Sequence, residues 1–236
     1  VISDINLTYS KISRDYLISE GFPADRIIKI GSPMREVINQ NLDKIKSSRI
    51  LKELNLKKNQ YFTVSFHREE NIDSKNFKNF INTLDTIADK YSLPIIFSTH
   101  PRTQKEIVDK EIECNSLIRF IKPINFSDYN SLQINSLLTL SDSGTISEES
   151  SILKFHALNI RDSHERPEAM EETSVIMTGT NSDRILQSIE LVKNEKINEI
   201  LNEVDDYSQN NISLKIERII LSYTDYINKM IWKKEY

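Results

Sequence analysis

Glycine is scarce in this sequence, and its scarcity excludes two common nucleotide-binding loops. The chain of 236 residues has four glycines, which are Gly21, Gly31, Gly144 and Gly179. With this spacing, neither a G-x-G-x-x-G turn nor a G-x-x-x-x-G-K-[ST] loop can be placed anywhere in the chain. The sequence therefore excludes dinucleotide-dependent dehydrogenases and P-loop kinases.

Residues that bind metals are also few. Cys114 is the single cysteine, so the chain has no internal disulfide and no multi-cysteine zinc site, which fits a reducing compartment. The four histidines are His67, His100, His156 and His164, and no two of them have H-x-H or H-E-x-x-H spacing. We therefore expect no metal site and no redox cofactor.

The sequence also lacks a basic surface and a long apolar run. The formal net charge is -4, and lysine and arginine alternate with acids along the chain, which does not favour a nucleic-acid partner. No apolar run approaches the roughly 20 residues of a membrane helix, and no charged-then-apolar signal opens the chain. We expect a cytoplasmic protein with neither a membrane nor a nucleic acid as partner.

After residue 60, short apolar runs alternate with amphipathic stretches, which is typical of βα units around a parallel sheet. Between residues 77 and 88 the apolar side chains recur at three- and four-residue steps, as on one face of a helix. The sequence predicts an α/β fold, a Rossmann-like parallel sheet flanked by helices. The predicted strands are residues 61–66, 94–98, 117–121, 136–140, 156–160 and 174–177, and the predicted helices are residues 77–88, 103–113, 127–135, 145–154 and 182–193.

We expect the two ends of the chain to lie outside this sheet. Residues 5–30 predict a strand, a helix and a strand, which suggests that residues 1–32 are the trailing edge of an earlier domain. We expect linker helices over residues 33–56, the main domain over residues 57–205, and a last helix within residues 206–236 that packs back toward the earlier domain. Because the chain opens without Met, we expect most of the earlier domain to lie outside this sequence.

Polar residues follow the predicted strands where a parallel sheet binds its ligands. All strands of such a sheet end on one side, so the residues after each strand converge on one crevice. A mixture of cations, hydroxyls and carboxylates suits an anionic ligand that also carries a diol. The candidate residues, in chain order, are His67, Arg68, Glu70, His100, Arg102, Lys122, Ser143, Gly144, Thr145, Glu149, Arg161 and Arg166.

The turn of Ser143, Gly144 and Thr145 is the most informative of these clusters. A turn that enters a helix offers unpaired N–H groups and the positive end of the helix dipole to phosphate, and glycine permits close approach. Glu149 follows Thr145 by four residues and can face the crevice, where a carboxylate accepts both hydroxyls of a ribose. Alternatively, Ser143 is an ordinary helix cap, and Glu148 and Glu149 are solvated helix charges.

Three segments resemble, in order and spacing, the signature segments of the non-hydrolysing UDP-N-acetylglucosamine 2-epimerases. They are residues 67–71 (HREEN), 141–149 (SDSGTISEE) and 161–168 (RDSHERPE). The resemblance implies the GT-B architecture, in which two Rossmann-like domains flank the active site and the carboxyl-terminal domain holds most of the UDP. This chain then corresponds to the carboxyl-terminal domain with the end of the amino-terminal one.

The resemblance also implies roles for individual residues. His67 is expected in the active site near the phosphates, Glu149 on the ribose hydroxyls, and Arg166 on the phosphates, where its planar fork suits bidentate binding. The other expected UDP contacts are Arg68, Glu70, Ser143, Gly144 and Thr145. Further possible contacts are His100, Arg102, Lys122 and Arg161.

The reaction implied by the resemblance is elimination of UDP to a 2-acetamidoglycal, followed by re-addition with C2 protonated from the opposite face. It needs no metal or redox cofactor. The family's main acid and base carboxylates lie in the amino-terminal domain, so we expect this chain to bind UDP weakly and not to epimerise. We expect the full-length protein to be a homo-oligomer, most simply a dimer.

Glu69 and the segments 98–102 and 141–151 resemble the branch that forms UDP-N-acetyl-L-fucosamine for capsule or O-antigen synthesis. That branch epimerises a UDP-2-acetamido-2,6-dideoxy-L-talose precursor. Two alternatives stay open. One is a GT-B glycosyltransferase that uses a UDP-sugar, and the other is a non-catalytic module that binds a nucleotide-sugar.

Overall fold

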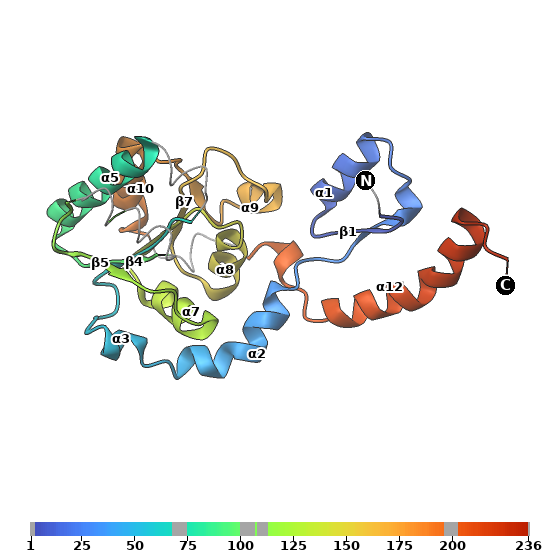
Figure 1. Cartoon of the computed structure of the whole chain (residues 1–236), viewed down its shortest axis with the longest axis horizontal. Coiled ribbons are helices and arrows are strands. Elements are labelled where there is room, and N and C mark those ends of the chain that lie inside the picture. Colours follow the sequence, from blue (N-terminus) through green and yellow to red (C-terminus); the bar gives the residue numbers. More distant parts are fainter. Residues whose placement is uncertain (1–2, 68–74, 100–106, 108–112, 196–202, 236) are drawn as a thin grey trace. The chain divides into compact units, whose positions relative to one another are not determined.

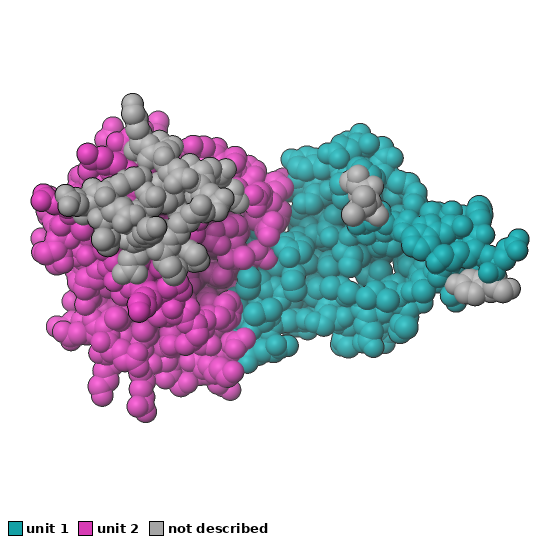
Figure 2. Space-filling view, in the orientation of Figure 1, with its two compact units in different colours: residues 1–40, 203–236 teal, residues 41–202 magenta. Residues whose placement is uncertain are grey.

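The chain forms two compact units, which are coloured separately in Figure 2. The computed structural model describes residues 3–67, 75–99, 107, 113–195 and 203–235. Unit 1 comprises Val1–Gln40 and Glu203–Tyr236, and unit 2 comprises Asn41–Asn202. Among the described helices, none has both the length and the apolar character required to cross a membrane.

Unit 2 is built on a parallel sheet, as the sequence predicts. Within its described residues, the strands are ordered β5-β4-β3-β6-β7-β8 and every neighbouring pair is parallel. Each predicted strand is confirmed with slightly different ends. The strands are β3 (Phe62–Ser65), β4 (Ile95–Ser98), β5 (Ile118–Ile121), β6 (Leu138–Ser141), β7 (Ala157–Asn159) and β8 (Ile176–Met177).

Helices cover both faces of this sheet, because successive side chains of a strand point in opposite directions. In β4, Phe97 belongs to the main apolar core, whereas its neighbour Ile96 packs with Tyr61 and Leu132 on the other side. Figure 1 shows α5 and α10 on one face and α7 and α8 on the other. These helices are α5 (Lys75–Tyr91), α7 (Phe126–Asn135), α8 (Ile146–Leu153) and α10 (Ser182–Val192).

The four helices just named confirm the helices predicted at those positions. Asn125 and Asn181 cap α7 and α10 by accepting a hydrogen bond from a backbone N–H of the first turn. A short further helix, α9 (Pro167–Glu171), begins at a proline, the residue whose missing N–H costs least at that position. The helix predicted over residues 103–113 lies almost wholly outside the described residues.

The sheet changes its direction of growth between β3 and β6. From β3 the chain adds β4 and then β5 on one side, and afterwards it adds β6, β7 and β8 on the other. Ser65 of β3 is therefore in register with Ser141 of β6, and the loops that follow these residues start side by side. Such a reversal opens a crevice at the carboxyl edge of the sheet, where α/β proteins bind ligands.

Unit 1 contains the predicted strand, helix and strand. They are β1 (Asn6–Thr8), α1 (Lys11–Ser19) and β2 (Ile27–Lys29), and the two strands pair in parallel. The unit also contains α12 (Ile212–Tyr226), which continues into a π-helical turn (Ile227–Ile231). The Tyr226 hydroxyl donates a hydrogen bond of 3.0 Å to the Asp25 carboxylate, which ties α12 to the short 3₁₀ helix (Ala24–Arg26) before β2.

Two helices connect the units. They are α2 (Met34–Lys46), which contains the boundary between the units, and α3 (Ile50–Glu53). Just before α2, Gly31 has a φ of +91°, and a β-carbon there would lie 3.0 Å from the Asp206 carbonyl oxygen. Glycine is therefore required at this turn both by its backbone angle and by its close neighbour.

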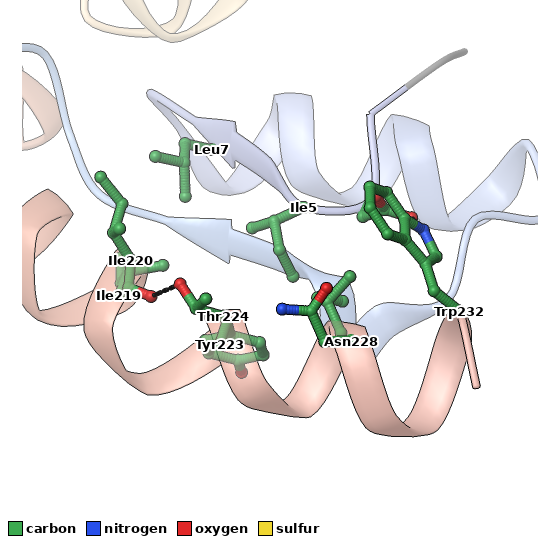
Figure 3. A pocket seen from close by; sticks show the side chains of 10 residues that line it. Ile5, Leu7, Ile219, Ile220, Tyr223, Thr224, Asn228 and Trp232 are labelled. Carbon is green, nitrogen blue, oxygen red and sulfur yellow. Dashed lines mark hydrogen bonds between the residues drawn. The ribbon is translucent and has the colours of Figure 1, made fainter. Parts of the chain in front are cut away.

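An apolar pocket of about 390 Å³ lies between β1 and the last helix within unit 1 (Figure 3). Ile5 and Leu7 face it from the strand side, and Tyr223 and Trp232 face it from the helical side. Thr224 also faces the pocket, but its hydroxyl donates to the Ile220 carbonyl oxygen. The pocket therefore offers mainly hydrocarbon surface.

We predict that Leu84→Ala lowers the free energy of unfolding by about 3 kcal/mol, because it leaves a cavity in the main core of unit 2. Leu84 is fully buried on α5. The matched control is Leu191→Ala on α10, whose side chain is 57% exposed, and it should change the value by less than about 0.5 kcal/mol. Urea unfolding followed by far-UV circular dichroism measures both, and equal effects would contradict the core assignment.

Candidate functional site

A pocket of about 300 Å³ lies at the carboxyl edge of the sheet in unit 2, and we call it the polar pocket because most of its lining residues have polar side chains. The structure brings four of the predicted site residues to this pocket, although they come from two segments that are more than 70 residues apart in the sequence. They are His67, Ser143, Thr145 and Glu149. Its other lining residues are Ser65, Ser98, Pro123, Ile124, Phe126, Tyr129, Gln133 and Ser141.

Asp142 joins the ends of β3 and β6. Its carboxylate oxygen Oδ2 accepts a hydrogen bond of 2.9 Å from the backbone N–H of His67, and its own N–H donates to the Ser65 carbonyl oxygen over 3.2 Å. Asp142 is buried, so this charge-assisted bond is shielded from water. The contact holds the start of the loop after β3 against the turn that enters α8.

The turn from Ser143 to Thr145 is held by its own hydroxyl groups. The Ser143 N–H donates to the Ser141 hydroxyl over 3.1 Å, and the Thr145 N–H donates to the Ser143 hydroxyl over 3.3 Å. Thr145, not Ser143, occupies the N-cap position of α8, so the alternative that Ser143 is the helix cap is wrong. The first turn of α8 thus begins at the pocket, where its N–H groups and dipole favour an anion.

Glu149 is a buried carboxylate at the base of the pocket, with only 8% of its surface exposed. Its Oε1 accepts a hydrogen bond of 2.9 Å from the Thr145 hydroxyl, and its Oε2 accepts one of 2.7 Å from the Gln133 side-chain amide. Burial raises the pKa of Glu149, and the two hydrogen bonds oppose that rise. Because Glu148 is also buried, the alternative that both residues are solvated helix charges is wrong.

Two arginines pair with carboxylates near the same turn. Nε and Nη2 of Arg166 lie 3.3 Å from Oε2 of Glu148, and Nη2 of Arg161 lies 2.7 Å from Oε1 of Glu165. A β-carbon added at Gly144 would lie 3.4 Å from Oε2 of Glu165 and 4.0 Å from Nη1 of Arg161. Arg161 is therefore beside the turn, and its charge reaches the space that Gly144 leaves open.

The other predicted site residues are placed differently. Lys122 is exposed and does not line the polar pocket. Arg68, Glu70, His100 and Arg102 lie outside the described residues. His156 precedes β7 at the opposite edge of the sheet, where burial lowers its pKa, in agreement with a structural role.

Gln133 and Tyr129 are pocket residues that the sequence reasoning missed. The periodicity of residues 127–135 indicates a helix against the core, and a polar residue on such a face has no separate sequence signal. The unusual run of buried polar residues on α7, from Asn130 to Gln133 with Leu132 as its apolar member, is visible only once burial is known.

Within the described part of the chain, no group of three or more His, Cys, Asp or Glu side chains is arranged to hold a metal ion. The donors that reach the polar pocket are hydroxyl, amide and backbone N–H groups, which suit an anion and a polyol better than a metal. The apolar pocket of unit 1 lacks such donors in comparable number. The polar pocket is thus the better candidate for a charged ligand.

The parallel sheet and its flanking helices define a Rossmann-like α/β protein, and the candidate site lies at the strand reversal, where such folds bind ligands. The chain belongs to the UDP-N-acetylglucosamine 2-epimerase family, because the model of that family matches residues 1–221. The fold agrees with the GT-B structures of epimerases of this family.

Known proteins of this family are similar over most of the chain. The UDP-N-acetylglucosamine 2-epimerase of Methanocaldococcus jannaschii is 31% identical over 205 residues, which are 84% of this chain and 56% of that protein. The chain thus spans about half the length of that relative.

Solved structures give the same result. A Rickettsia bellii UDP-N-acetylglucosamine 2-epimerase matches with a TM-score of 0.91 and 45% identity, over 99% of this chain and 63% of that one. The Methanocaldococcus jannaschii enzyme in complex with UDP-GlcNAc and UDP matches with a TM-score of 0.84 and 29% identity, over 94% of this chain and 62% of that one.

We predict that Glu149→Gln stabilises the fold progressively as pH rises. The folded pKa of Glu149 lies above its ordinary value of 4.5, so the folded protein binds this proton more tightly than the unfolded chain does. Ionisation of Glu149 therefore costs stability as pH rises from about 4.5 through the folded pKa, and glutamine does not ionise.

Unfolding free energies of both proteins between about pH 4 and about pH 8 test this prediction. The stability of the variant relative to the original chain should be constant below the ordinary pKa and should rise above it. A difference that does not change with pH would show that Glu149 is not destabilised by its burial.

Proposed function

We propose that this chain is the UDP-binding part of a nucleotide-sugar 2-epimerase. The whole protein would invert C2 of a UDP-2-acetamido sugar by elimination and re-addition of UDP. The observation that carries this proposal is the meeting of His67, the turn at Ser143 and Thr145, and the buried Glu149 at one pocket. Membership of the family supports it, as do the relatives whose structures contain UDP-GlcNAc or UDP.

In this proposal, different parts of the pocket bind the diphosphate and the ribose of UDP. The turn of Ser143, Gly144 and Thr145, with the start of α8 behind it, receives the diphosphate. Glu149 lies one helical turn deeper and accepts the ribose hydroxyls. A volume of about 300 Å³ is at the lower end of the range for ligand pockets.

Cations complete the diphosphate site in this proposal. Arg166 and Arg161 are paired with Glu148 and Glu165, and a bound diphosphate would compete with these carboxylates for the guanidinium groups. Elimination leaves more negative charge on the departing UDP, so preorganised N–H groups and guanidinium groups lower the barrier. We propose Arg68, Glu70, His100 and Arg102 as further contacts.

His67 is the proposed catalytic residue of this part of the protein. Its side chain is exposed at the pocket, while its backbone is held by Asp142. An imidazole there would donate a hydrogen bond to the leaving diphosphate and so stabilise its developing negative charge. The acid and base for C2 would come from the part of the protein beyond this chain, so we expect UDP binding without turnover.

Finer assignments follow from the sequence resemblance. We propose the branch that forms UDP-N-acetyl-L-fucosamine, a role in capsule or O-antigen synthesis, and a homo-oligomeric full-length enzyme. A GT-B glycosyltransferase would share the UDP site and differ in needing an acceptor.

The full-length protein, incubated with candidate UDP-sugars in deuterated water and followed by proton NMR, tests the reaction. We expect isomerisation without an acceptor, with deuterium incorporated at C2, because the proposed mechanism breaks and re-forms that C–H bond. Transfer to an acceptor would support the glycosyltransferase. Binding without either reaction would support the non-catalytic module.

We predict that Gly144→Ala weakens UDP binding by this chain at least about tenfold, because a methyl group would occupy the space through which phosphate approaches the turn. Its β-carbon makes only ordinary contacts with Glu165 and Arg161, so the stability should change by less than about 1 kcal/mol. Isothermal titration calorimetry with UDP and with uridine measures the effect. Equal losses for both ligands would contradict a phosphate role for the turn.

A further inference from the structure

Gln133 is a fully buried amide whose side chain contacts Glu149. It belongs to α7, and its Nε2 donates to Oε2 of Glu149 over 2.7 Å. An amide buried in an apolar setting costs free energy unless it is hydrogen-bonded. The neighbouring Leu132 is equally buried and apolar, so burial on α7 does not by itself require a polar side chain such as Gln133.

The orientation of this amide follows from the charge opposite it. If the amide were rotated, its oxygen would face a carboxylate oxygen at 2.7 Å and repel it. In the stable orientation Oε1 points elsewhere, and among the described residues this buried oxygen has no hydrogen-bond partner. The hydrogen bond from Nε2 of Gln133 to Glu149 thus leaves Oε1 of Gln133 unsatisfied.

The Glu149 carboxylate has acceptor positions that its hydrogen bonds to Thr145 and Gln133 do not use. An ionised carboxylate has about four lone-pair positions, two on each oxygen. The Thr145 hydroxyl takes one position on Oε1, and Gln133 takes one on Oε2. One position remains on each oxygen, and a ribose presents two adjacent hydroxyl donors.

We propose that Gln133 is a positioning residue, which through its hydrogen bond holds the Glu149 carboxylate in the orientation that accepts both ribose hydroxyls. The inference rests on the proposed UDP site and adds a residue whose effect on the ligand passes through Glu149.

The proposal includes a pH dependence. Among the described residues, the titratable groups that interact with Glu149 are Glu148 on its own helix and Tyr129 on α7, and His67 lines the same pocket. Tyr129 is neutral, because burial raises the pKa of its phenol further above the ordinary range. Its hydroxyl is buried beside Ser65 without forming a hydrogen bond of good geometry among the described residues.

Loss of Gln133 removes one of the two hydrogen bonds that oppose the raised pKa of Glu149. The carboxylate then becomes protonated at higher pH and loses acceptor positions. The acid limb of the UDP affinity should therefore move to higher pH.

The test uses Gln133→Met, which keeps the length and volume of the side chain but removes the donor. Leu132→Met is the matched control, because its site is equally buried and does not contact Glu149. The ligands are UDP and 2′,3′-dideoxy-UDP, measured by isothermal titration calorimetry on the complete 236-residue chain. The second ligand lacks the hydroxyls that Glu149 would accept.

We expect Gln133→Met to weaken UDP binding about tenfold and to leave the affinity for the dideoxy ligand within about twofold, because only UDP depends on the orientation of the Glu149 carboxylate. Leu132→Met should affect neither ligand. Equal losses for the two ligands, or no loss for either, would overturn the positioning role. An acid limb of the UDP affinity that does not move would also overturn it.

If the variant does not fold, NMR of the unaltered chain gives the answer. The side-chain amide resonance of Gln133 should follow the titration of Glu149 and should shift with UDP much more than with the dideoxy ligand. Failure of the unaltered chain to bind UDP at all would refute the proposed function itself, whereas normal UDP binding with an unresponsive Gln133 amide would refute only this inference.

Discussion

Three carboxylates are buried within eight residues after β6, and the hydrogen bonds and the ion pair that they form hold the candidate site together. Asp142, Glu148 and Glu149 are 2%, 2% and 8% exposed, and a buried carboxylate without partners costs several kcal/mol. Their partners come from the loop after β3, the segment before α9, and α7. Satisfying these charges therefore joins segments that are distant in the sequence.

The same charges link stability and ligand binding. The burial that raises the pKa of Glu149 makes its ionised form costly to the fold, and its remaining lone pairs make it a good acceptor for hydroxyl groups. The pairs of Arg166 with Glu148 and of Arg161 with Glu165 hold guanidinium groups near the turn that we propose as the phosphate site. Natural sites often accept such a local cost in order to be preorganised.

Much of the fold was predictable because its signals are local. The strands of unit 2 are short apolar runs, and α5 carries its core residues at helical spacing, so periodicity alone located them. The convergence of His67, Ser143 and Glu149 was predictable too, because parallel strands end on one edge. The site prediction failed to include Gln133, since a polar residue within an amphipathic helix resembles any solvated residue.

The sequence by itself determined the class of fold, the edge of the sheet that holds the candidate site, and the tight turn from Ser143 to Thr145, because each depends on neighbours in the chain or on a general rule for parallel sheets. Only the tertiary structure decided which groups pair there. The strand order placed β6 beside β3, and α7 and α8 packed on the same face so that Gln133 met Glu149. Such pairings depend on the path of the whole chain, which no local pattern encodes.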